Sequence, residues 1–166
     1  MQYTYTELAA YLLLYSFIGW ALEVAFFAVK ERRFCNRGFF SLPFCPEYGI
    51  MMDILILLLP EQGTKWLLQF LTTWMVVSVV EYFSGGIAAK IWKKHLWNYE
   101  DVTLFGGKKK SVLLSLIKAA VVMTAVLLLH PPVFILFSMI PTIVLRIIDI
   151  VGFGLMAADL VSILIA

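Results

Sequence analysis

The sequence predicts an all-α, polytopic helical membrane protein with about five transmembrane helices, one of them short or re-entrant, and a short interfacial helix. The 166 residues are 62% hydrophobic and only 14% charged, with a mean hydropathy of +0.92. Soluble domains are nearer half apolar and a quarter charged. A soluble chain of this length has too little interior to bury so much apolar surface, so we expect residues 1–166 to form a single integral membrane domain.

The first apolar run covers residues 8–29 and is followed by the charged stretch 30–33. About 20 helical residues cross a bilayer, so this run predicts a spanning helix. No basic residue precedes it and no clear cleavage site follows, which indicates a retained anchor and not a signal peptide. Residues 34–49 then combine five aromatic residues with two prolines. The prolines exclude a regular helix, and the aromatic side chains predict a segment packed at the interface or against the protein.

Later apolar runs predict the remaining helices. Asp53 lies in a run that is short for a crossing, so this helix either spans a thinned region or is re-entrant. The stretch His130-Pro131-Pro132 is expected to stop a spanning helix, because proline cannot continue the backbone hydrogen bonds. The short helix is predicted over residues 48–59, and two spanning helices over residues 66–89 and 112–129. The interfacial helix follows over residues 133–140 and the last spanning helix over residues 141–166.

Basic residues cluster in two segments. Four of the 13 Lys and Arg residues lie in residues 30–37 and six in residues 90–110. The positive-inside rule places both segments in the cytoplasm, the N-terminus outside and the C-terminus inside the cell membrane. Cys35 and Cys45 show no metal-binding spacing and are then expected as reduced cytoplasmic thiols.

Four acidic residues within apolar runs are candidate site residues: Glu23, Asp53, Glu81 and Asp159. Ionisable groups are costly inside a membrane and therefore indicate functional sites. Counting back from the cytoplasmic ends places all four within about two helical turns of that boundary. The alternative is that each carboxylate reaches water or caps a neighbouring helix.

Two of these acids lie on helix faces that carry small residues. Ser16 and Gly19 share a face with Glu23, and Ser78 and Gly85 share one with Glu81. Small residues allow close helix approach, so both faces are expected to point into the bundle. Two carboxylates in a low dielectric repel each other unless a cation lies between them. Arg37, a substrate or a metal ion would supply it, and we expect Glu23, Glu81 and Arg37 to form one electrostatic unit.

The other charged groups have simpler interpretations. Lys118 is expected to extend its ammonium group to the cytoplasmic interface, and Arg146 and Asp149, three residues apart, are expected to pair. The lysines of residues 90–110 act as a topology signal and attract anionic lipid. The sequence contains no nucleotide-binding, metalloprotease or other cofactor motif. We therefore predict no cofactor and no metal site, and the net charge of +2 indicates no nucleic-acid partner.

Several motifs resemble a known family. Tyr15-Ser16-Phe17-Ile18-Gly19-Trp20 with Glu23, followed by Asn36-Arg37-Gly38-Phe39, is similar to the bacterial family of putative ABC-transporter permeases, type IV. The similarity continues through Pro43, Cys45-Pro46, Tyr48-Gly49, Glu81-Tyr82 with Gly85, Trp97-Asn98-Tyr99, His130-Pro131 and Asp159. This resemblance implies a membrane protein of five or six helices with a transport role. It also places Asn36 beside Arg37 among the candidate binding residues.

The leading hypothesis is a transport-type permease subunit that binds a polar or cationic solute at Glu23 and Glu81. Because the chain has no ATPase motif, a separate ATPase or another subunit would dock on the basic loops, and a pore would require a second copy of the chain. Membrane lipids are the other expected partner. Two alternatives stay open: an intramembrane enzyme acting on lipid headgroups with a carboxylate base, and a non-transporting membrane assembly partner.

Overall fold

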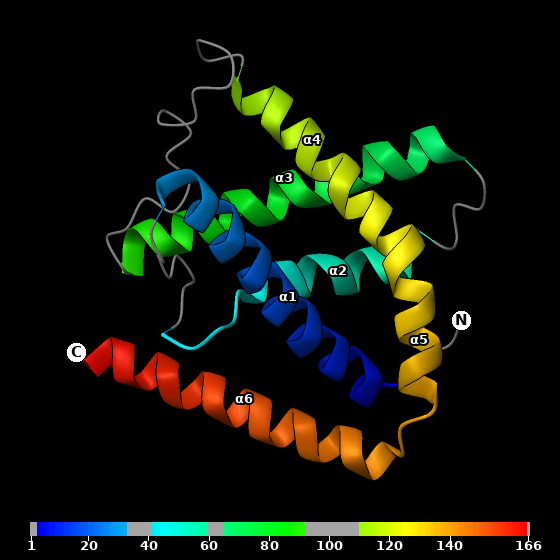
Figure 1. Ribbon diagram of the computed structural model, residues 1–166, viewed down its shortest axis with the longest axis vertical. Helices are drawn as coiled ribbons and strands as arrows, with labels where there is room; N and C mark the ends of the chain where they lie inside the picture. The colour runs from blue at the N-terminus through cyan, green and yellow to red at the C-terminus, as the bar shows by residue number, and fades with distance from the viewer. Residues whose placement is uncertain (1–2, 33–40, 60–64, 92–109, 166) are drawn as a thin grey trace. The chain divides into compact units, whose positions relative to one another are not determined.

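Helix α1 (Tyr5–Glu31) begins at a capping box formed by Thr4 and Glu7 (Figure 1). The Thr4 N–H donates to Glu7 Oε2 at 2.8 Å, and the Glu7 N–H donates to Thr4 Oγ1 at 3.3 Å. These two bonds satisfy donors that have no partner inside the helix. The helix ends at Arg32, whose φ of 52° is in the left-handed region common at helix C-termini.

This computed structural model describes residues 3–32, 41–59, 65–91 and 110–165. All regular structure within these ranges is helical, which confirms the predicted all-α class. After α1 come α2 (Pro46–Leu58), α3 (Trp66–Ile91), α4 (Lys110–Thr124), a π-helical turn (Ala125–Leu129), α5 (His130–Ser138) and α6 (Thr142–Ile165).

Four helical segments in the described ranges are long and apolar enough to cross a membrane: Tyr5–Ala25, Trp66–Ser84, Ser115–Ser138 and Thr142–Ile165. The prediction of about five spanning helices therefore differs by one. Helix α2 has 13 residues and is about 20 Å long, against a hydrocarbon thickness of about 30 Å. It is the helix that the sequence identifies as short or re-entrant.

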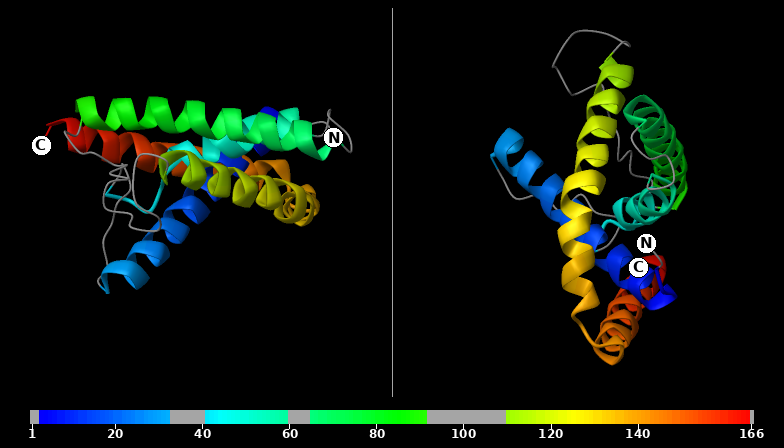
Figure 2. Two further views of the ribbon diagram at one scale, coloured as in Figure 1. Left: turned by 90° about the horizontal axis from the view of Figure 1, so that it is seen from above. Right: turned by 90° about the vertical axis from the view of Figure 1, so that its right-hand side faces the viewer.

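The predicted stop at His130-Pro131-Pro132 is wrong. Helix α4 continues through the π-helical turn into α5, so that Ser115–Ser138 is one continuous apolar segment (Figure 2). In this turn the His130 N–H donates to the Ala125 carbonyl, five residues back. The wider turn makes room for proline rings that would clash with the carbonyls of a regular α-helix. Residues 133–140 are consequently not a separate interfacial helix.

The helices form two compact units. Unit 1 comprises Met1–Asp53 and Val133–Ala166, and unit 2 comprises Ile54–Pro132. In unit 1, α1 and α6 lie side by side (Figure 1), and Gly152 of α6 lies against the Leu13 side chain of α1.

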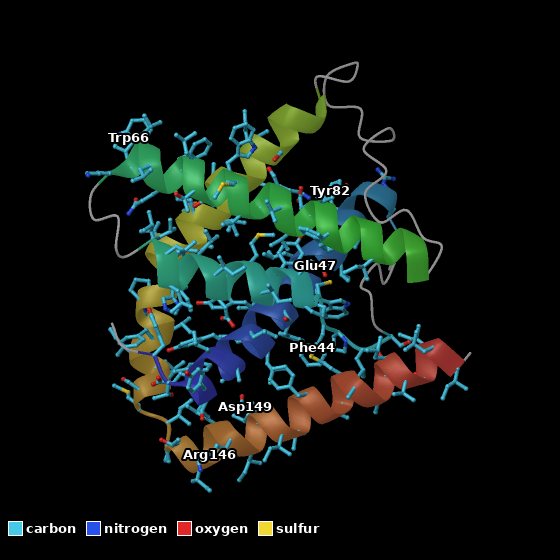
Figure 3. The ribbon with its side chains drawn as sticks, turned by 180° about the vertical axis from the view of Figure 1, so that it is seen from behind. Phe44, Glu47, Trp66, Tyr82, Arg146 and Asp149 are labelled. Atoms are coloured by element: carbon cyan, nitrogen blue, oxygen red, sulfur yellow. The ribbon has the colours of Figure 1, made fainter. Side chains whose placement is uncertain are left out.

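Unit 1 also anchors the chain that enters α2. Phe44 packs against the core pair Leu13 and Met156 (Figure 3). The Leu42 N–H donates to Asp159 Oδ2 at 3.1 Å, and the Cys45 N–H donates to the Ser16 carbonyl at 3.0 Å. For residues 41–49, this confirms the prediction of an ordered segment packed on the helices.

In unit 2, α3 and α4 pack against each other, and Thr73 and Val77 are buried. The outward side chains of α3 are large and apolar, as they are on α6 in unit 1. The exposed set on these two helices includes Leu67, Leu71, Met75, Val79, Ile143, Ile147, Ile150 and Leu164. Apolar surface of this extent suits contact with lipid and not with water.

Candidate functional site

The contact between α1 and the first turns of α2 is the candidate site in unit 1. We call it the α1–α2 seam and define it by Ser16, Gly19 and Glu23 of α1 with Tyr48, Gly49 and Asp53 of α2. Two of the predicted carboxylates, Glu23 and Asp53, therefore belong to one helix pair.

Two glycines allow the helices of the seam to approach closely. The Tyr48 ring lies directly over Gly19, where a Cβ would collide with it. On the opposite helix, a Cβ on Gly49 would collide with the Leu12 carbonyl oxygen and with Ser16 Oγ. The face of Ser16 and Gly19 thus contacts protein, as the small-residue pattern predicts.

Glu23 lies at one end of the seam. The Tyr48 hydroxyl donates a hydrogen bond of 2.7 Å to Glu23 Oε1. Hydrogen bonds to an ionised carboxylate are short and roughly twice as strong as neutral ones. This bond fixes the Glu23 carboxylate on α2 and holds it at the protein-facing side of α1.

Asp53 and Ser16 provide polar atoms that the protein leaves without a hydrogen bond. Ser16 is fully buried, with an exposed fraction of 0%. Its Oγ and Asp53 Oδ1 are both buried and lack a hydrogen-bond partner within the described part of the chain. Asp53 also interacts electrostatically with Tyr15 of α1. Buried polar atoms are nearly always paired in folded proteins, so each exception requires a specific explanation.

Cys45 lies just before α2 and is a buried free thiol. Burial, together with the nearby charges of Glu47 and Glu23, raises the pKa of the Cys45 thiol well above its usual value. Because the thiolate is the reactive form, burial and the raised pKa both disfavour reaction of Cys45. Its role here is packing, which agrees with the absence of any metal-binding spacing around it.

The acids of α6 have different surroundings. Asp159 accepts the Leu42 N–H, so it holds the segment before α2 in place. The expected Arg146–Asp149 ion pair is not formed, since Arg146 is exposed whereas Asp149 Oδ1 is buried without a partner in the described residues. Figure 3 shows the Asp149 side chain on the side of α6 that faces α1. A three-residue spacing permits a pair, but here the two side chains point in different directions.

In unit 2, Glu81 binds a protein cation. Lys118 Nζ of α4 lies 2.6 Å from Glu81 Oε1 of α3, with side-chain exposed fractions of 24% and 14%. The Lys118 ammonium therefore pairs across the helix contact, a partner that the expected extension to the interface did not include. One turn away, Trp74 Nε1 donates to Ser115 Oγ at 3.0 Å, and Ser78 Oγ is 3.4 Å from the same oxygen.

The structure thus groups the predicted site residues differently from the sequence. Glu23, Asp53 and Asp159 belong to unit 1 and Glu81 to unit 2, while Asn36 and Arg37 lie outside the described residues. The predicted unit of Glu23, Glu81 and Arg37 stays a prediction. Within the described residues, no group of three or more His, Cys, Asp and Glu residues is arranged to hold a metal ion.

Sequence reasoning missed two functional partners, Tyr48 for Glu23 and Lys118 for Glu81. Each partner is on a different helix from its acid, 25 and 37 residues along the chain. Helical spacing identifies a face but not the helix that covers it. A tyrosine and a lysine in apolar segments at a depth similar to that of the acids were the available signals.

A family model described as "Putative ABC-transporter type IV" matches residues 10–164 of the chain. The match includes every seam residue and the Glu81–Lys118 pair, and it confirms the resemblance seen in the sequence motifs. No curated protein and no solved structure matches the chain.

Proposed function

The chain belongs to the Putative ABC-transporter type IV family, and from this premise we propose that it is the membrane subunit of a transporter that binds a polar or cationic solute at intramembrane carboxylates. The family and the four apolar helices make it a multi-pass membrane protein of ABC-transporter type. The solute site is our proposal, and we place it at the α1–α2 seam.

The observation that carries the proposal is the buried Asp53 carboxylate oxygen, which has no hydrogen-bond partner among the described residues. A buried carboxylate is costly unless a cation or hydrogen-bond donors compensate it. A transport protein gains from such a group, because the solute supplies the compensation when it binds. Glu23 supplies a second carboxylate at the same seam, held in place by Tyr48.

Glu81 has a different role in this proposal. Its charge is already compensated by Lys118, so the pair stabilises the contact between α3 and α4. Asp159 likewise accepts a backbone N–H and orders the segment before α2. We propose that these two acids support the fold around the site without contacting the solute.

The partners that we propose follow from the missing ATPase motif and from the exposed apolar side chains. Since its sequence has no ATPase motif, we propose that a separate ATPase or another subunit drives transport and binds the basic cytoplasmic segments. A second copy of the chain would complete a pore. Lipid acyl chains would cover the exposed apolar faces of α3 and α6.

We further propose that the N-terminus is outside and the C-terminus inside. Both basic segments are cytoplasmic only if the chain crosses twice between residues 37 and 90, once in α3 and once in α2 with its flanking residues. Single cysteines at Thr4 and Lys65 should react with an impermeant maleimide from outside, and one at Ser111 only after permeabilisation. Labelling of Thr4 and Lys65 from opposite sides would show that α2 does not cross.

Solute binding can be tested with the purified full-length protein. A panel of metal cations, amines, amino acids and sugars is screened by thermal unfolding; a true ligand at about 100 times its Kd stabilises by about 2.7 kcal/mol. The Asp53→Asn and Glu23→Gln variants should lose this shift. Glu7→Gln is the matched control, because it removes the same charge from the α1 cap and should keep the shift. Equal shifts in all variants would refute the seam as the solute site.

A second candidate function is the non-transporting assembly partner, and one observation favours it. Glu23, Glu81 and Asp159 each have a protein partner, as expected if the acids only order the helices. This alternative predicts that no solute stabilises the protein and that Asp53→Asn leaves assembly with the partner subunit intact. The solute screen on the wild-type protein distinguishes the two functions, because only the transport subunit should show a solute-induced shift.

A further inference from the structure

Two unpartnered oxygens at the α1–α2 seam indicate the class of ligand that it binds. Ser16 has an exposed fraction of 0%, and its Oγ points at the backbone of Gly49. Asp53 follows Gly49 by one helical turn on the same face of α2, where side-chain positions are about 5–6 Å apart. Ser16 Oγ and Asp53 Oδ1 both lack a hydrogen-bond partner among the described residues.

The neighbouring backbone adds a third oxygen. The Leu12 carbonyl oxygen of α1 also lies against Gly49, on the same side of this glycine as Ser16 Oγ. Tyr15, which is on α1 like Leu12, interacts electrostatically with Asp53 of α2. A hydroxyl and a carbonyl of α1 therefore lie at Gly49, one helical turn of α2 from the Asp53 carboxylate.

We propose that this region binds one monovalent metal cation, Na⁺ or K⁺, between Asp53 and the Leu12–Ser16 turn of α1. The inference rests on the proposed function and narrows it, since it names the class of cation at the seam. Hard cations take oxygen ligands from carboxylates, carbonyls and hydroxyls, and these are the groups present.

Charge and space favour a single small ion. Asp53 contributes one negative charge, which a monovalent cation neutralises, whereas water would leave it uncompensated. Divalent ions bind several carboxylates, and no described group of three such ligands exists. The close approach of the two helices at Gly49 favours a small ion over a bulkier organic solute beside Ser16. An organic ammonium group is therefore not the ligand expected at this position.

The test uses the purified full-length protein in choline chloride. NaCl or KCl replaces choline chloride at constant ionic strength, and both the midpoint of thermal unfolding and the heat of binding are measured. The midpoint should rise and saturate with one of these cations. Asp53→Asn should abolish the saturable response, and Ser16→Ala should weaken the apparent Kd about tenfold, because one ligand to a charged ion is lost.

Asp149→Asn is the matched control, since it removes another aspartate with a buried, unpartnered oxygen in unit 1 and should keep the wild-type Kd. If Asp53→Asn does not fold, the comparison of Ser16→Ala with Asp149→Asn decides.

Absence of a saturable response in the wild type would overturn the inference, as would an unchanged Kd in Ser16→Ala. Tighter binding of an organic amine than of either metal ion would overturn it while the proposed solute binding stands. If neither a metal cation nor any organic solute shifts the midpoint, the inference and the proposed function both fail.

Discussion

The two units treat a carboxylate within apolar helices in opposite ways. In unit 2, Glu81 is neutralised by Lys118 at 2.6 Å, and the pair belongs to the protein itself. In unit 1, Asp53 keeps a buried oxygen without any described partner. A complete ion pair stabilises one arrangement of helices, whereas an incomplete site leaves part of its stability to whatever binds. This difference supports the structural role that we propose for the first acid and the binding role that we propose for the second.

The largest effect is expected in unit 2. Lys118→Met removes the cation and leaves Glu81 partly buried and unpaired, which should lower the free energy of unfolding by about 3 kcal/mol. The double variant with Glu81→Gln should recover most of this loss, because the stranded charge is gone. Thermal unfolding of both single variants and the double variant measures the coupling. Additive losses would show that Glu81 does not depend on Lys118.

Two glycines, Gly49 in unit 1 and Gly86 in unit 2, test how closely the helices approach within each unit. Gly49→Ala places a Cβ against the Leu12 backbone carbonyl, which cannot move as a flexible side chain would, and should destabilise by about 2 kcal/mol. Gly86→Ala in α3 meets nothing within 4 Å and should be neutral or stabilise by about 0.5–1 kcal/mol through helix propensity. Unfolding midpoints of the two variants give the comparison. Equal midpoints would contradict the close α1–α2 contact.

Neutralising Asp53 should have a smaller effect of the opposite sign. In choline chloride, Asp53→Asn should stabilise the protein by about 1 kcal/mol, because it removes a buried charge that no cation of the described residues compensates. For a chain of this size this corresponds to a midpoint about 2–4 °C higher. Glu81→Gln in the same buffer should destabilise, since it strands Lys118. A loss of stability in both variants would show that Asp53 is compensated in the protein as Glu81 is, and would contradict the difference between the two units.

The smallest change concerns Cys45, where no loss of stability is expected. In a Cys35→Ser background, a permeant maleimide should label folded wild-type protein only slowly, because burial raises the pKa of the Cys45 thiol and keeps it protonated. Gly49→Ala, which separates the helices beside this thiol, should react faster. Rapid labelling of the wild type at neutral pH would show that the seam is open.

The helix class and the protein-facing side of α1 could be predicted from the sequence, because apolar runs and the spacing of Ser16 and Gly19 are local properties. The partners of the acids could not. Lys118 was expected to extend to water because its depth alone favours that, whereas the structure pairs it with an acid 37 residues earlier in the chain. Tyr48 was read as part of an aromatic segment, and its hydroxyl instead holds Glu23.

The π-helical turn was missed for a related reason. Its side chains, Ala125–Leu129, are all apolar, so nothing in their hydropathy distinguishes the turn from regular helix. Only the prolines that follow mark the position, and they were interpreted as a stop. In a membrane a break is costly, because exposed backbone groups find no water. Widening one turn keeps the helix continuous, and this explains why a spanning segment tolerates the two prolines.

That turn also changes what the span presents to its surroundings. Pro131 and Pro132 have no N–H to donate, so the helix lacks two donors at this level and carbonyl oxygens are left in need of others. The turn Ala125–Leu129 is apolar in every side chain, but the main chain is hydrophilic at this depth. A neighbouring group at that depth, whether water, a hydroxyl group or a lipid glycerol, therefore has to donate a hydrogen bond to these carbonyl oxygens.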